Sequence, residues 1–207
     1  MFRIPRHIGI IPDGNRRWAK GNGLRKEEGY SFGLEPGREV LRLAKKYGVK
    51  ELTYYGFTVD NCKRPQKQVA AFSEACVDAV KIMEKEDADI RVVGNTKSSC
   101  FPTTLVPYTE WGKYQKSGES DSTKIKVNLL VNYGWEWDMK NNWASRQIPR
   151  IDMVIRWGGM CRLSGFLPIQ TVYADFYIIP ELWPDFKGEQ FVAALEWYQK
   201  QDVTLGG

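Results

Sequence analysis

The chain has 207 residues, of which 43% are hydrophobic and 27% charged, and its formal net charge is +5. This length and composition predict one globular domain with a sizeable core, spanning residues 1–207. The modest positive charge suits an anionic ligand such as a diphosphate, a nucleic acid or an acidic membrane surface. No apolar stretch of about 18 residues is present, which argues against a membrane-spanning helix. The N-terminal residues lack the apolar core of a signal peptide.

Cysteine content and spacing favour a cytoplasmic protein. The four cysteines show no CxxC spacing, and His7 is the only histidine. This set does not match a zinc site, and reduced thiols in the cytoplasm are the simple interpretation.

Hydrophobic periodicity predicts strands that alternate with helices. Apolar and β-branched runs predict strands at 8–11, 52–57, 90–94, 125–133, 153–156 and 175–179. Apolar stripes predict helices at 29–47, 66–85 and 188–201, and a further helix begins near residue 16. Residues 95–121 are expected to form loop and short helix, with a flexible tip at 115–123. This alternation implies a largely parallel sheet with helices on both faces, an α/β fold.

The predicted helix at 66–85 carries small residues beside its apolar stripe. They are Ala70, Ala71, Ala75 and Ala79. The stripe is expected to pack in the core, and the small side chains would also leave room for a slender apolar ligand.

Residues 7–20, HIGIIPDGNRRWAK, combine an apolar strand, a polar turn and a basic helix start. Backbone N–H groups left unpaired at such a turn form an anion site, and arginine matches phosphate oxygens in a bidentate way. A carboxylate at Asp13 fits if Mg²⁺ bridges it to a phosphate, because Mg²⁺ is usually held by one or two carboxylates plus substrate phosphates. The alternative is an ordinary turn in which Asp13 caps the helix and the arginines are solvated.

Polar and basic residues follow four of the predicted strands. These clusters lie at 13–17, 58–64, 132–136 and 156–164. Because ligands bind at the carboxyl ends of the strands in open parallel sheets, the four clusters are expected to converge on one rim.

The chain resembles the cis-prenyltransferases, the family of undecaprenyl diphosphate synthase, over nearly its whole length. DGNRRWAK carries the resemblance first, followed by GFTVDNCKRP at 56–65, NLLVNYGWEWDM at 128–139 and the long block at 152–186. The resemblance implies a mostly parallel sheet with an apolar cleft, and a homodimer. It implies Mg²⁺-dependent transfer of a prenyl group from an allylic diphosphate to a second five-carbon diphosphate.

The family motifs can be carried across residue by residue. The resemblance assigns catalytic roles to Asp13, Asn61 and Arg64. Diphosphate binding is expected at Gly14, Asn15, Arg16, Arg17, Trp18, Lys26, Tyr30, Arg156, Arg162 and Ser164. Within this set, Arg156, Arg162 and Ser164 match the residues that hold the acceptor diphosphate. The resemblance places Mg²⁺ ligands at Asp13 and Asp175, and Asp175 stands where the family usually has a glutamate.

Several positions depart from the family pattern. Tyr30 replaces a usual histidine, Cys62 a usual tryptophan and Trp157 a usual threonine, and residues 140–151 are far fewer than relatives carry there. These departures surround the acceptor side and the cleft, so they bear on acceptor identity and product length. Trp157 and Trp135 are expected to shorten the cleft.

Three functions remain open at this stage. One is an ordinary cis-prenyltransferase that uses isopentenyl diphosphate. Another is an irregular, lavandulyl diphosphate synthase-like relative that joins dimethylallyl units head-to-middle. The third is a non-catalytic subunit, which would be expected to lose the Asp13 turn that this chain keeps. No nucleic acid partner is expected, and membrane association is expected only through the product.

Overall fold

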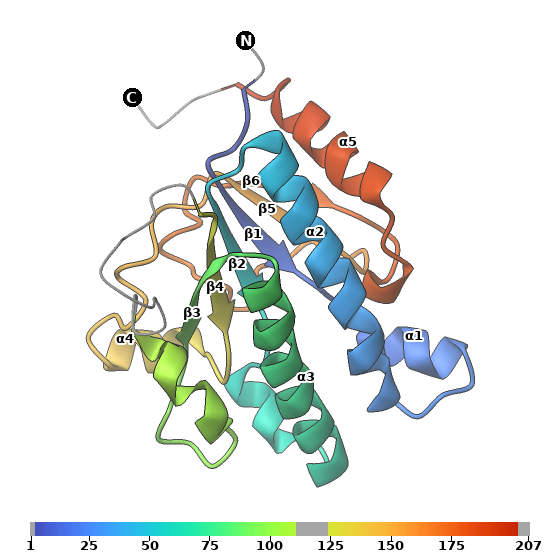
Figure 1. Ribbon diagram of the computed structural model, residues 1–207, viewed down its shortest axis with the longest axis vertical. Coiled ribbons are helices and arrows are strands. Elements are labelled where there is room, and N and C mark those ends of the chain that lie inside the picture. Colours follow the sequence, from blue (N-terminus) through green and yellow to red (C-terminus); the bar gives the residue numbers. More distant parts are fainter. Residues whose placement is uncertain (1–2, 111–123, 203–207) are drawn as a thin grey trace.

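The computed structural model describes residues 3–110 and 124–202. Its centre is a six-stranded sheet with the order β3-β4-β2-β1-β5-β6, and every pair of neighbouring strands is parallel (Figure 1). The strands are β1 (His7–Ile11), β2 (Glu51–Tyr55), β3 (Asp89–Val93), β4 (Lys126–Leu130), β5 (Met153–Arg156) and β6 (Asp175–Ile178). The predicted parallel α/β sheet is therefore confirmed.

Helices and short 3₁₀ turns connect these strands. The helices are α1 (Asn15–Gly21), α2 (Leu34–Tyr47), α3 (Gln66–Lys85), α4 (Trp135–Lys140) and α5 (Gly188–Tyr198). The 3₁₀ turns are η1 (Glu28–Gly33), η2 (Val59–Lys63), η3 (Thr103–Thr109) and η4 (Trp183–Asp185). The bounds of α3 match the prediction, whereas α4 was not predicted. The predicted flexible tip at 115–123 lies outside the described residues.

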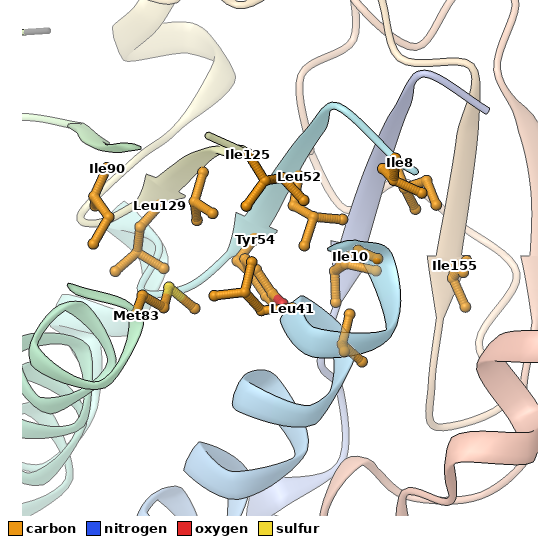
Figure 2. Packing of buried hydrophobic residues seen from close by; sticks show 14 of the residues in the cluster. Ile8, Ile10, Leu41, Leu52, Tyr54, Met83, Ile90, Ile125, Leu129 and Ile155 are labelled. Carbon is orange, nitrogen blue, oxygen red and sulfur yellow. The ribbon is translucent and has the colours of Figure 1, made fainter. Parts of the chain in front are cut away.

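The two faces of the sheet are covered differently. Helices α2, α3 and α5 pack on one face, where alternate strand residues such as Ile8, Ile10 and Leu52 form the larger core (Figures 1 and 2). The other face is covered by the chain between α4 and β6, including Phe166 and Leu167. Helix α4 contributes Trp137 to this second face.

Strands β2 and β4 are shorter than their apolar runs predicted. Their pairing ends at Tyr55 and Leu130, and the Gly56 N–H donates to the Leu130 carbonyl at 3.1 Å. The Tyr133 N–H still donates to the Phe57 carbonyl at 3.1 Å, so the two segments continue side by side beyond the regular ladder. This continuation carries the polar residues that follow β2 and β4 to the same edge of the sheet.

No helix in the described parts of the chain is long and apolar enough to cross a membrane.

A buried polar row crosses the sheet at the amino ends of β1, β2 and β4. The Nδ1 of His7 lies 3.2 Å from the Arg150 carbonyl, and its Nε2 lies 2.8 Å from the Thr53 hydroxyl. A carbonyl can only accept, so Nδ1 carries the proton and Nε2 accepts from Thr53. The side-chain amide of Asn128 in turn donates to the Thr53 oxygen at 3.1 Å. This pattern requires a neutral His7, because a protonated ring would present a second N–H to Thr53 in place of an acceptor.

Acid is therefore expected to destabilise the fold through His7. Burial lowers the pKa of His7 from its ordinary value of 6.5 to about 4. Between these values the unfolded chain binds more protons than the folded one, so stability is complete above pH 6.5 and falls as the pH drops towards 4. The expected loss is about 2 kcal/mol at about pH 5 and about 3 kcal/mol in full.

Urea unfolding at about pH 7.5 and about pH 5 measures this loss. The variant His7→Gln removes the titrating group and should lose less stability than the wild type on acidification. Equal losses in the two proteins would show that other groups dominate the acid response.

Candidate active site

A polar cleft of about 590 Å³ opens at the carboxyl ends of β1, β2 and β5. It brings together most of the residues that the sequence singled out. The predicted residues that line it are Asp13, Gly14, Asn15, Arg16, Arg17, Lys26, Tyr30, Asn61, Arg64, Arg156 and Ser164. The expected convergence of strand ends on one rim is therefore found for the clusters at 13–17, 58–64 and 156–164.

Asp13 follows β1 and contacts both Arg17 and Arg156. Its Oδ2 accepts from Arg156 Nη2 at 2.8 Å, and its Oδ1 lies 3.4 Å from Arg17 Nη2. Helix α1 begins after Gly14, whose φ is 115°, and no side chain caps it. The alternative in which Asp13 caps the helix is therefore wrong, and its carboxylate, about one third exposed at 33%, faces the cleft instead.

Arg156 is the buried cation of the cleft, with a side chain that is only 4% exposed. Besides Asp13, its guanidinium donates to the Ser164 hydroxyl at 3.1 Å and to the backbone carbonyl of Arg162. Strand pairing places Arg156 beside Ile11, immediately before the turn that carries Asp13. The order of β1 and β5 in the sheet thus fixes the contact between the two charged groups.

Tyr55 supports this arrangement and was missed from the sequence. Its hydroxyl donates to the Ser164 backbone carbonyl at 2.8 Å. Ser164 has a φ of 52°, a conformation that costs free energy and persists because its surroundings hold it. Burial raises the pKa of Tyr55, so its hydroxyl remains a donor at neutral pH. Its position at the end of an aromatic strand beside a polar cluster was the available signal.

Arg17 is fixed from the β5 side by Gly158. Its Nη2 donates to the Gly158 carbonyl at 3.0 Å. Gly158 has a φ of 86°, and a Cβ added there would overlap the Arg17 guanidinium and lie 3.1 Å from the Asp13 backbone oxygen. A glycine is needed at this position both for the backbone conformation and for the close approach of Arg17.

Replacing Gly158 with alanine is expected to lower activity about 100-fold, because the Cβ displaces Arg17 and with it the Asp13 carboxylate. Gly159→Ala is the matched control: its φ is 73°, yet the nearest atoms to an added Cβ lie 3.7 Å away. Both variants should lose roughly 1–2 kcal/mol of stability from left-handed backbone strain. Thermal unfolding of the two variants measures the backbone strain, and steady-state assays measure the effect of displacing Arg17. Equal activities of the two variants would refute the role given to Gly158.

Residues of η1 and of the segment that follows β2 form the other side of the cleft. Arg64 Nη1 donates to the Tyr30 hydroxyl at 2.9 Å, and the Tyr30 ring stacks on Phe72 with centroids 4.4 Å apart. Asn61 lines the cleft, and its side-chain oxygen accepts from the Thr58 N–H at 3.2 Å. Arg64 and Tyr30 are thus held together, although they lie 34 positions apart in the chain.

The charge of the cleft suits diphosphates. Its cationic residues outnumber its acids, which are Asp13 and Asp60. The cations are Arg16, Arg17, Lys20, Lys26, Arg64 and Arg156. No group of three or more His, Cys, Asp or Glu side chains that could hold a metal occurs in the described residues, so the protein alone offers no metal cage. One carboxylate beside a strongly cationic cleft fits Mg²⁺ held jointly by protein and substrate phosphates.

Asp175 is not brought to this cleft. It begins β6 and pairs with Met153, whereas Arg156, which binds Asp13, pairs with Ile178. Three residues along a strand span about 10 Å, so Asp175 lies towards the opposite, amino-terminal edge of the sheet. The prediction that Asp13 and Asp175 share a metal is therefore not supported within one chain.

Two other predicted phosphate ligands also lie outside the cleft lining. The Trp18 indole donates to Asp185 at 2.7 Å and packs against Phe32. The Arg162 side chain is exposed, and only its backbone carbonyl takes part, by accepting from Arg156.

A smaller apolar pocket of about 80 Å³ adjoins the cleft between α2 and α3. Ala75 and Ala79 from the small-residue stripe of α3 line it, whereas Ala70 and Ala71 do not. Trp157 lies in the core instead, with its ring 4.8 Å from that of Trp183, so the expectation that Trp157 shortens the cleft is wrong. Trp135 is 49% exposed and lines neither cavity.

The parallel sheet and its cationic cleft define an α/β protein with a cleft suited to anionic ligands. A family model described as "Putative undecaprenyl diphosphate synthase" matches residues 11–145 and 139–206. Two relatives are ditrans,polycis-undecaprenyl-diphosphate synthases described as (2E,6E)-farnesyl-diphosphate specific. The one from Vibrio parahaemolyticus is 28% identical over 98% of this chain and 91% of its own length. The one from Pasteurella multocida is 30% identical over 99% of this chain and 95% of its own length.

A solved structure shares the fold. Lavandulyl diphosphate synthase from Lavandula x intermedia, in complex with dimethylallyl diphosphate, superimposes with a TM-score of 0.81 at 23% identity and covers 99% of each chain. The chain belongs to the undecaprenyl diphosphate synthase family. It is accordingly a transferase of the cis-prenyltransferase type.

Proposed function

We propose that this protein transfers a dimethylallyl group from its diphosphate to a second five-carbon isoprenoid diphosphate, giving a ten-carbon prenyl diphosphate. The observation that carries the proposal is Asp13, which contacts both Arg17 and Arg156 in a cationic cleft that opens into a small apolar pocket. The cleft suits two diphosphates, and the pocket suits one short prenyl tail.

The allylic diphosphate is assigned to the turn after β1. Gly14, Asn15 and Arg17 line the cleft there, and Arg17 stabilises the negative charge that develops as the C–O bond breaks. Mg²⁺, when bound through Asp13 and the diphosphate, would supply further charge neutralisation to the leaving group. The apolar pocket beside this turn holds the prenyl tail and excludes water from the reacting carbon.

The acceptor diphosphate is assigned to Arg156 and Ser164. Their mutual hydrogen bond and the contact of Arg156 with Asp13 place the two diphosphate sites next to each other. Holding both substrates lowers the barrier by proximity, an effect worth up to about 7–11 kcal/mol in favourable cases. One C–C bond forms, the allylic C–O bond breaks, diphosphate leaves, and a proton passes from the acceptor carbon to a diphosphate oxygen.

A second candidate is irregular, head-to-middle condensation of two dimethylallyl units. The pocket volume favours it over long-chain synthesis, and the similar lavandulyl diphosphate synthase binds dimethylallyl diphosphate. The sequence alignment supports divergence from the long-chain relatives. It spans 235 positions with the Vibrio synthase, more than the 207 residues here, so the relative carries residues without a counterpart in this chain.

Incubation of the purified protein and Mg²⁺ with dimethylallyl diphosphate, alone or with isopentenyl diphosphate, tests both candidates. A linear ten-carbon product that requires isopentenyl diphosphate supports head-to-tail transfer. A branched product from dimethylallyl diphosphate alone supports the irregular reaction. No product from any pairing would overturn both and favour a non-catalytic subunit.

We further infer one catalytic domain over residues 1–207 and a homodimer. One sheet carries the cleft residues, which supports the single domain. Large apolar side chains are exposed on α4, just after it and on the segment before β6, which supports a partner there. They include Trp135, Met139, Trp143, Ile169, Val172 and Tyr173. Analytical ultracentrifugation measures the oligomeric state directly.

A further inference from the structure

The apolar pocket and the polar cleft share a narrow set of wall residues. Both cavities are lined by Pro12, Asn15, Tyr30, Gly56 and Phe72. A substrate with its diphosphate in the cleft must therefore pass its tail between these residues to reach the pocket. We call the Tyr30–Phe72 ring pair the neck.

The neck is held in place from several sides. The two rings are stacked, with centroids 4.4 Å apart and planes 6° from parallel. Arg64 donates to the Tyr30 hydroxyl at 2.9 Å, and its guanidinium lies 5.9 Å from the Phe72 ring centroid. Tyr30 is only 5% exposed, so its ring cannot turn into solvent without breaking these contacts.

Core side chains form part of the pocket wall. Its lining includes Tyr54, Met83 and Leu129, which belong to the main core (Figure 2) and are each less than 5% exposed. The Tyr54 hydroxyl donates to the Gly37 carbonyl at 2.9 Å. Deepening the pocket would require repacking of core side chains, which is costly in a close-packed interior. The pocket therefore does not deepen readily into the core.

That volume is small for a prenyl chain. A cavity of about 150 Å³ takes up benzene, which has six carbons. The pocket here measures about 80 Å³, so it suits no more than one five-carbon unit. Tyr30 and Phe72 line this pocket as well as the cleft, so a ten-carbon tail that needs more space displaces Tyr30 from Phe72 and Arg64.

We propose that Tyr30, held by Phe72 and Arg64, is the residue that limits the allylic substrate to a single five-carbon tail. This inference rests on the proposed prenyl transfer and names the substrate class of the same site. Tyr30 acts as a specificity-determining residue in addition to lying beside the allylic diphosphate. The pocket is mostly apolar and Tyr30 lines it, so the discrimination comes from the space that the Tyr30 ring occupies and not from charge.

The test compares dimethylallyl with geranyl diphosphate, using the same acceptor and the wild type, Tyr30→Ala and Tyr30→Phe. The wild type should favour dimethylallyl diphosphate in kcat/KM by at least about 100-fold. Tyr30→Ala should shift this ratio towards geranyl diphosphate by at least about tenfold. Tyr30→Phe keeps the ring and should keep the ratio within about threefold, although losing the Arg64 hydrogen bond can lower turnover of both substrates.

A folded Tyr30→Ala protein with an unchanged ratio would overturn the proposal, as would a wild type that uses both substrates equally. Phe72→Ala opens the same neck from α3 and replaces Tyr30→Ala if that variant does not fold. Calorimetric binding of unreactive thiolodiphosphate analogues of both substrates gives the same ratio without turnover. If no substrate pair reacts while the analogue ratio shifts as expected, the proposed reaction fails and the role of the neck stands.

Discussion

Replacement of Asp13 with asparagine is expected to reduce prenyl transfer by about 10³-fold while leaving the fold intact. In the wild type, Arg156 Nη2 lies 2.8 Å from the Asp13 carboxylate. Asparagine keeps an oxygen that can accept from this nitrogen, so the buried guanidinium retains a partner. It loses the negative charge that would hold Mg²⁺ against the leaving diphosphate. Steady-state rates and far-UV circular dichroism measure the two parts of this expectation.

The matched control for Asp13 is Asp78→Asn. Asp78 forms an exposed ion pair with Lys81 on α3 and does not line the cleft, so the same chemical change there should leave the rate near that of the wild type. An Asp13→Asn enzyme with a rate within a few-fold of the control would remove the basis of the proposed mechanism. Measuring the rate of each variant against Mg²⁺ concentration tests the metal separately. Only Asp13→Asn should need a higher Mg²⁺ concentration for half-maximal activity.

The variant Arg156→Lys is expected to lower kcat/KM for the acceptor by at least about 100-fold even though it keeps the charge. The guanidinium of Arg156 contacts Asp13, Ser164 and the Arg162 carbonyl at once. A single ammonium cannot reproduce this planar set of donors, so the acceptor diphosphate loses its orientation relative to the allylic carbon. Initial rates with varied acceptor concentration measure the effect.

The exposed Arg146 provides the control for this change. Its Nη1 donates to the Asn142 carbonyl at 3.2 Å and it does not line the cleft, so Arg146→Lys should leave kcat/KM unchanged. If Arg156→Lys raised KM for the allylic substrate alone, the assignment of Arg156 to the acceptor side would be wrong. If it changed neither constant, Arg156 would have only a structural role.

Much of the fold was predictable because its signals are local. Apolar runs and helical stripes placed every strand of the sheet and most of its helices, and polar residues directly after three strands marked the cleft. Strand ends were predicted too long where Gly56 ends the regular pairing. Helix α4 was missed because six residues are too few to show a clear helical period.

The parallel α/β architecture and the chemistry of the rim, from Asp13 to Arg156 and Ser164, follow from the sequence alone. These depend on the order of residue types along the chain and on the rule that parallel strands end at one edge. Tertiary structure decided which candidates meet. Asp175, which was proposed from the resemblance, begins β6, and strand register places it towards the other edge of the sheet. Side-chain alternation turns Trp157 away from the face that Arg156 occupies. The neck of Tyr30 and Phe72 was also decided only in three dimensions, because its size depends on how segments distant in the chain pack together.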